Sequence, residues 1–191
     1  MQTNISNETL KIIKQRRSIR SFKDEQIKDE ELQAVLEAGL YAPYAWEQSR
    51  HFTVIQKKEL LDRLNLAAKE AAQQTGMEHL RSLGNDEAFN CLYGAPTLII
   101  VSGSEQAPIP LEADCSAAIQ NLLLAAESIG LGSCWIFFAM LAFNSTQGSE
   151  LLKELKIPCG YKPYYSVLLG YKSAATVNIP ERYSDLITYI K

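Results

Sequence analysis

The sequence predicts a layered domain of the α/β or α+β class, in which helices cover a sheet of short strands. Three observations support this prediction. Residues 96–103, PTLIIVSG, form an unbroken apolar run of the kind that lies buried on both faces of a sheet. Residues 112–129 indicate one long helix that is apolar over most of its circumference, so we expect it in the core or in a subunit interface. Helices and short apolar strands alternate along the rest of the chain.

The expected helices are recognised by capping residues and by apolar side chains at helical spacing. Asn7 is the expected N-cap of the first helix, and Asp29 is that of the second. Gly130 follows the long helix in the position of a left-handed C-cap. The helices are expected at residues 8–16, 30–42, 57–74, about 86–93, 112–129 and about 149–155.

The expected strands are short segments rich in β-branched and aromatic residues. They span residues 51–56, 96–103, 133–138 and 164–171. No internal repeat and no low-complexity linker divides the chain, and a length of 191 residues fits one domain. We therefore expect a single domain over residues 1–191.

Composition and charge argue against several classes of function. The formal net charge is −3, so no general basic field favours nucleic acid or an anionic membrane. The four cysteines are far apart and form no CxxC pair, and only two histidines accompany them, which argues against a zinc site. The first residues lack the apolar core of a signal peptide, and no run reaches the length of a membrane span. We expect a cytoplasmic protein with free thiols.

The segment QRRSIRSF, residues 15–22, gathers three arginines and two serines in a mildly acidic chain. One interpretation is a solvated basic turn in which Arg16 and Arg17 meet the negative end of the first helix. The other is an anion site, because forked guanidinium groups, hydroxyls and backbone N–H groups are the donors that a phosphate needs. Arg20 lies beyond the helix and favours the anion site, but the residues alone leave both interpretations open.

Five segments, in order, resemble the nitroreductase family of FMN-dependent oxidoreductases, and together they cover nearly the whole chain. The first is RRSIRSF. The others are AGLYAPYAWEQSRHFTVIQ (38–56), YGAPTLIIVSG (93–103), AAIQNLLLAAESIGLGSCWI (117–136) and IPCGYKPYYSVLLGYK (157–172). The resemblance implies an α+β three-layer fold, with a central, mostly antiparallel sheet flanked by helices, in an intertwined homodimer.

The resemblance also implies which residues hold FMN in a cleft between two subunits. The arginine cluster would bind the phosphate and the pyrimidine edge of the ring, joined by Arg182 or, as second choice, by Lys172. The loop 43–48 would cover the flavin from the partner subunit, and the strand end at 134–137 would run along it with a backbone N–H near N5. The implied cofactor-binding residues are Arg16, Arg17, Ser18, Arg20, Pro43, Tyr44, Ala45, Trp46, Gln48, Cys134, Trp135, Ile136, Phe137 and Arg182.

Two places depart from the family pattern. Tyr44 stands where the family has Ser, and Trp46 and Glu47 replace a region that holds an Asn. The two aromatic side chains could stack over a ring or simply pack. Phe137 and Phe138 stand where small residues follow the Ile, so we expect a narrower substrate space or a rearranged strand.

The implied function is hydride transfer from NADH or NADPH, through flavin N5, to an electron-poor small molecule such as a nitroaromatic or a quinone, in ping-pong order. The sequence holds no Ser-His-Asp order, paired-acid motif or P-loop, which fits an enzyme whose cofactor carries the chemistry. No residue is assigned as catalytic, since solvent can supply the proton.

Three alternatives stay open. The first is an FMN-binding protein of the same fold with low turnover. The second is a flavin enzyme of different chemistry, such as reductive dehalogenation or flavin fragmentation. The third is an anion or RNA binder without flavin, against which the acidic balance and the lack of aromatic residues interleaved in a basic stretch both count.

Overall fold

The computed structural model describes residues 5–173, 179–183 and 185–191. Its helices are α1 (Glu8–Gln15), α2 (Asp29–Leu40), α3 (Lys58–Gln73), α4 (Glu78–Asn85), α5 (Glu112–Ser128) and α6 (Gly148–Glu154). Its strands are β1 (Arg50–Ile55), β2 (Thr97–Ser104), β3 (Gly132–Ile136) and β4 (Tyr161–Gly170). A 3₁₀ helix, η1, spans Phe138–Asn144.

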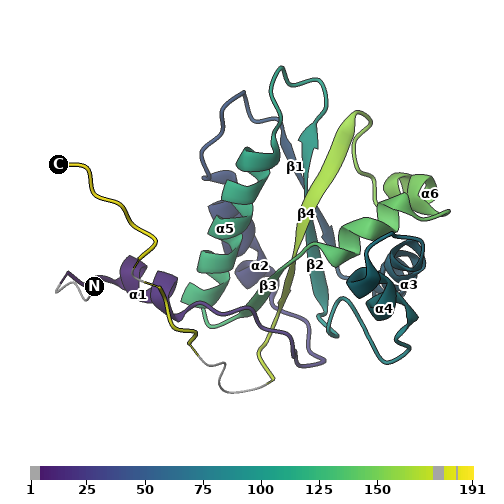
Figure 1. The fold of residues 1–191 in the computed structure, drawn as a ribbon, viewed down its shortest axis with the longest axis horizontal. Helices are drawn as coiled ribbons and strands as arrows, with labels where there is room; N and C mark the ends of the chain where they lie inside the picture. Colours follow the sequence, from purple (N-terminus) through teal and green to yellow (C-terminus); the bar gives the residue numbers. More distant parts are fainter. Residues whose placement is uncertain (1–4, 174–178, 184) are drawn as a thin grey trace.

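The elements form three layers (Figure 1). The middle layer is a four-stranded sheet in the order β1-β2-β4-β3, and each neighbouring pair is antiparallel. Helices α2 and α5 cover one face of this sheet, and α3 with η1 covers the other. The predicted α+β fold with a central antiparallel sheet is therefore confirmed.

Strand β2 explains why residues 96–103 are apolar without alternation. Leu98 and Ile100 belong to the core cluster that contains α3, whereas Ile99 and Val101 belong to the cluster that contains α5. All four side chains are fully buried. A strand covered on both faces needs apolar side chains at odd and even positions alike, which is the pattern the sequence shows.

Helix α5 fills the centre of the second core cluster, as its apolar circumference predicts. Ile119, Leu122 and Leu123 are buried against the sheet and α2. The helix ends in a Schellman turn, in which the Leu131 N–H donates to the Ala126 carbonyl (2.9 Å) and Gly130 takes a φ of +83°. The predicted C-cap role of Gly130 is confirmed.

The N-caps of the first two helices were predicted with mixed success. The Asn7 side chain accepts a hydrogen bond from the Leu10 N–H (2.9 Å), which confirms the first cap. The prediction for Asp29 is wrong, because Asp29 is already helical and Lys28 is the N-cap. Here the Glu31 carboxylate accepts a hydrogen bond from the Lys28 N–H at 2.9 Å, so a side chain in the first turn of the helix binds the backbone of the residue that precedes the helix.

The helix predicted at residues 86–93 is wrong: α4 ends at Asn85 and turns follow. Two polar side chains in this segment take nearby backbone donors. Asp86 accepts the Ala88 N–H (2.9 Å), and Asn90 accepts the Leu92 N–H (2.8 Å). Such local hydrogen bonds compete with helix formation, and the Lys69 ammonium further holds the segment through the Asp86 and Phe89 carbonyls.

The strand predicted at residues 133–138 ends early, at Ile136. Phe137 leaves the sheet, and Phe138 begins η1, which the sequence analysis did not predict. Five consecutive η1 residues are buried: Phe138, Ala139, Met140, Leu141 and Ala142. These side chains belong to the core cluster that contains α3, so the chain leaves the sheet after Ile136 and continues as a helical turn packed on that helix.

The segment after α1 runs beside the open edge of β3. The Ile19 N–H donates to the Ser133 carbonyl (2.9 Å), and Ser18 pairs with Ser133 in a parallel bridge. Farther on, the Lys23 N–H donates to the Tyr171 carbonyl (2.9 Å). These bonds hold the arginine cluster at the end of the sheet where α5 passes into β3.

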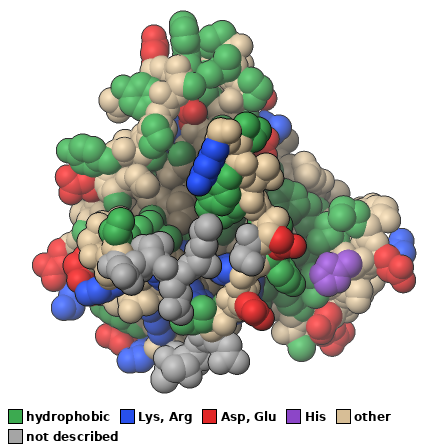
Figure 2. Space-filling view, turned by 60° about the vertical axis from the view of Figure 1, so that its left-hand side comes forward, with side chains coloured by type: hydrophobic (Ala, Val, Ile, Leu, Met, Phe, Trp, Pro, Cys, Tyr) green, Lys and Arg blue, Asp and Glu red, His purple; other side chains and the backbone are tan. Residues whose placement is uncertain are grey.

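The surface turned forward in Figure 2 carries charges of both signs. Lys and Arg side chains are interspersed there with Asp, Glu and apolar side chains, and no single-sign patch covers this face. None of the helices in the described residues is both long and apolar enough to cross a lipid bilayer.

Candidate functional site

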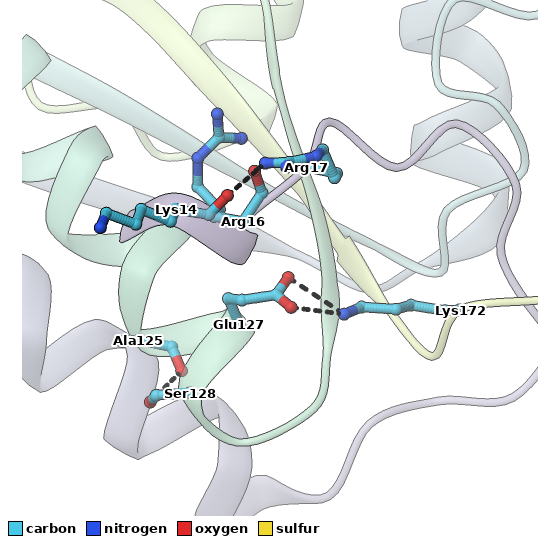
Figure 3. Close-up of polar contacts among 7 residues, drawn as sticks. All are labelled: Lys14, Arg16, Arg17, Ala125, Glu127, Ser128 and Lys172. Carbon is cyan, nitrogen blue, oxygen red and sulfur yellow. Dashed lines mark hydrogen bonds and ion pairs between the residues drawn. The ribbon is translucent and has the colours of Figure 1, made fainter. Parts of the chain in front are cut away.

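Arg16 and Arg17 leave the end of α1 in different directions (Figure 3). The Arg17 side chain turns back, and its Nη1 donates to the carbonyls of Lys14 (2.8 Å) and Arg16 (2.6 Å). Its Nε and Nη2 are buried and find no hydrogen-bond acceptor among the described residues. Arg17 thus donates to carbonyls at the end of α1, as the interpretation of this segment as a turn at the helix end expects. Its buried Nε and Nη2 remain available as donors, as the anion site requires.

Arg16 and Arg20 keep their guanidinium groups free of any carboxylate within ion-pair distance in the described part of the chain. Arg20 is exposed and lies over the ring of Tyr93, at 5.9 Å from the ring centre. Like-charged guanidinium groups in one short segment repel one another, and a bound anion would offset that repulsion.

Cys134 lies against the same cluster from the side of β3. Burial raises the pKa of its thiol, while the Arg20 charge, a Ser18 hydrogen bond and the Arg16 charge oppose that rise. The fold therefore places Cys134 beside three of the predicted site residues. Its side chain is 1% exposed and belongs to the core, so the thiol stays protonated and packs.

The two candidates for a further phosphate ligand differ in their surroundings. The Lys172 ammonium is bound by both carboxylate oxygens of Glu127, each at 3.0 Å, so its charge is already paired (Figure 3). Arg182 is exposed and forms no ion pair within the described residues. No described contact joins Arg182 to the arginine cluster in this single chain, and its predicted role stays a prediction.

The loop 43–48 is exposed along its whole length, but its first half is firmly held. Arg50 donates to the carbonyls of Ala42 (2.9 Å) and Pro43 (3.2 Å), and its guanidinium lies 5.7 Å from the centre of the Tyr44 ring. The Ala45 N–H donates to a carboxylate oxygen of Asp114 at 2.8 Å. The loop presents Tyr44 and Trp46, each about half exposed, and Gln48 to solvent.

The end of β3 presents two exposed aromatic side chains. Trp135 packs edge-on against Tyr165, with ring centres 5.1 Å apart, and Phe137 is 54% exposed. Ile136 between them is buried in the core. Of the four predicted strand residues, Cys134 and Ile136 support the sheet, whereas Trp135 and Phe137 are exposed and available to a ligand.

Arg50 and Asp114 position the loop, and sequence reasoning missed both. A signal existed for Asp114, because it lies four residues before Ala118 and beside Cys115, on the apolar side of a largely apolar helix. A carboxylate on the buried face of a helix requires a partner. Nothing in the sequence identified the Ala45 backbone as that partner, since the two lie 69 residues apart.

A protein-family model described as the nitroreductase family matches residues 13–171 of the chain. The chain belongs to the nitroreductase family. The family predicted from the five segments is thereby confirmed, and with it the class of enzyme, a flavin oxidoreductase that uses NAD(P)H.

Curated relatives and solved structures agree with this membership in the nitroreductase family. A protein from Archaeoglobus fulgidus, provisionally named NADH dehydrogenase/NAD(P)H nitroreductase, is 32% identical over 169 residues, which cover 86% of this chain and 85% of the relative. The crystal structure of a nitroreductase with bound FMN from Bacteroides fragilis has a TM-score of 0.89 and 37% identity, and covers 97% of this chain and 100% of its own. A nitroreductase with bound FMN from Desulfitobacterium hafniense also has a TM-score of 0.89, with 32% identity over 98% of this chain and 100% of its own.

Proposed function

We propose that this nitroreductase-family protein binds FMN and passes hydride from NADH or NADPH to an electron-poor small molecule, such as a nitroaromatic or a quinone. The observation that carries the proposal is the state of Arg17. Its buried Nε and Nη2 lack acceptors among the described residues, beside two further guanidinium groups without ion-pair partners. A dianionic phosphate supplies the oxygens that such a group of forked donors needs.

The residues present fit FMN in three respects. Arg16, Arg17 and Ser18 would hold the phosphate, and Arg20 would place a positive charge near the pyrimidine edge of the ring, where it favours negative charge. The end of β3 would lie along the ring. When bound, FMN supplies an N5 atom that takes hydride from NAD(P)H and delivers it to the acceptor in ping-pong order.

The loop 43–48 would cover the flavin of the partner subunit in a homodimer. Its first half is held by Arg50 and Asp114, so it meets the partner as a preformed surface rather than a mobile one. Preformed contacts lose less entropy on binding, which suits a loop that completes a site on another chain. A cytoplasmic location stays a prediction.

A second candidate is an FMN-binding protein with low turnover. It is favoured by the exposed rings of Tyr44, Trp46 and Phe137, which could close the flavin face against substrates. Anaerobic titration of the purified protein separates the two candidates. We expect a yellow protein whose flavin absorbance is bleached by NADH or NADPH and restored by a nitroaromatic or a quinone.

The role of the arginine cluster is tested by Arg20→Ala, with Arg81→Ala on the exposed face of α4 as the matched control. We expect Arg20→Ala to weaken FMN binding about tenfold, the loss of one charge-assisted contact, while the control retains FMN. A variant Arg20→Ala with full FMN content and normal flavin reduction would contradict the assigned role. A colourless wild-type protein that takes up no flavin would overturn the proposed function altogether.

A further inference from the structure

A cavity of about 290 Å³ opens beside Phe137, between η1 and the first half of β4. It lies just past the end of β3, the strand end proposed to follow the flavin. Its walls are mainly aromatic and apolar, with Phe137, Met140, Phe143, Tyr164 and Tyr165 among them. Since a cavity of about 150 Å³ already takes one benzene ring, there is room here for one substituted ring.

Two charged side chains face this cavity, and only one of them is free. Glu112 accepts a hydrogen bond from the Tyr165 hydroxyl, which in turn raises the pKa of that hydroxyl and keeps it protonated as a donor. Lys162 lies over the Tyr164 ring, with its Nζ 5.3 Å from the ring centre. Within the described residues no carboxylate approaches Lys162 to ion-pair distance.

We propose that this cavity binds a planar aromatic molecule with one anionic substituent, such as an arene carboxylate. The ring would lie against Phe137 and the neighbouring tyrosines, and the anionic group would reach toward Lys162. Aromatic walls favour a flat, polarisable ring, and an unpaired ammonium favours a negative group. The role of such a molecule as electron acceptor rests on the proposed function, whereas its binding does not.

The experiment compares two ligands of equal shape, 4-nitrobenzoate and 4-nitrobenzamide, on the oxidised holoprotein by equilibrium dialysis. We expect the carboxylate to bind about threefold more tightly than the amide, the effect of one solvent-screened charge contact. Lys162→Gln should remove that preference. Lys153→Gln on α6, an exposed lysine outside the cavity, should keep it.

Equal affinity of the two ligands for the wild type, or a preference that survives Lys162→Gln, overturns the proposal. The dialysis involves no electron transfer, so a protein that fails as a reductase can still show the charge preference. Conversely, an active reductase without the preference would support the proposed function and exclude arene carboxylates as the ligands of this cavity. If the protein is an active reductase, we expect Lys162→Gln to raise the KM for 4-nitrobenzoate and to leave its kcat unchanged. The kcat/KM for 4-nitrobenzoate should then lose its advantage over that for 4-nitrobenzamide.

Discussion

At the scale of single residues, the guanidinium group of Arg17 divides its N–H bonds between two environments. Nη1 donates to the carbonyls of Lys14 and Arg16 at the end of α1, while Nε and Nη2 are buried without acceptors in the described structure. A buried donor left unpaired costs about 1–3 kcal/mol. A bound phosphate would accept these donors and remove that cost. We therefore expect Arg17 to contribute more to FMN binding than its position at a helix end suggests.

Arg17→Lys tests this division because it keeps the charge and removes the fork. We expect FMN to bind about tenfold more weakly, since one ammonium cannot satisfy a helix end and a phosphate together. Equilibrium titration of apoprotein with FMN measures the change. The same variant without FMN should unfold at nearly the wild-type denaturant concentration, and a large loss there with unchanged FMN affinity would make the role of Arg17 structural.

Asp114 is the residue through which α5 holds the loop 43–48. We expect Asp114→Ala to lower the free energy of unfolding by about 1 kcal/mol, because the part-buried Ala45 N–H loses a charged acceptor. The exchange of the Ala45 amide hydrogen should become at least about tenfold faster. Asp114→Asn keeps an oxygen acceptor and should restore the slow exchange; slow exchange in Asp114→Ala would show that the loop is held by Arg50 alone.

At the scale of elements, a side-chain contact joins the first turn of α2 to the sheet. The start of α2 is tied to the end of β4 by the Tyr171 hydroxyl, which donates to Glu31 at 2.6 Å. The hydrogen bonds from Tyr171 and from the Lys28 backbone lower the pKa of the Glu31 carboxyl. A lowered carboxyl pKa stabilises the fold above the pKa of the unfolded chain and ceases to do so as the pH falls through the folded value.

Tyr171→Phe should therefore lower the urea midpoint at pH 7. The difference from the wild type should shrink as the pH falls below about 4.5, where the unfolded chain begins to take up the proton, and should be lost as the pH falls through the lowered pKa of folded Glu31. Urea unfolding at pH 7 and pH 3.5 measures it. Tyr183→Phe, an exposed tyrosine in the C-terminal segment, is the matched control. A difference that grows toward low pH would contradict this account of Glu31.

At the scale of the whole molecule, the C-terminal segment runs away from the body of the fold (Figure 1). Ile179, Leu186, Ile187 and Ile190 are between 59% and 95% exposed. An apolar groove between α1, α2 and α5 is likewise open and includes Ile12 and Leu124. So much uncovered apolar surface fits the proposed intertwined homodimer better than a free monomer.

Removal of residues 179–191 should weaken the homodimer at least about tenfold, because burying even one aliphatic side chain contributes about 1.5–3 kcal/mol. Sedimentation at several concentrations measures the dissociation constant. The truncation also removes Arg182, so the full-length double variant Ile187→Ser, Ile190→Ser separates lost apolar contact from lost charge. A full-length monomer, or a truncated dimer as tight as the wild type, would contradict the role of this segment.

The sequence predicted local features well where a residue acts through its near neighbours. Asn7 caps α1 and Gly130 ends α5 because each satisfies backbone groups within a few residues. It failed at residues 86–93, where Asp86 and Asn90 use the same local chemistry to form turns instead of a helix. Periodicity does not distinguish these outcomes, since both place polar and apolar residues at similar spacing.

By itself, the sequence determined the family, the layered antiparallel fold and the gathering of three arginines after α1, because motif order and apolar patterning are written along the chain. Only the tertiary structure decided which donors of Arg17 stay unpaired, that Glu127 already pairs Lys172, and that Lys162 faces an aromatic cavity. The reason is physical: hydrogen bonds, ion pairs and cavities join residues that are distant in sequence, and their energies depend on burial and geometry, which only packing specifies.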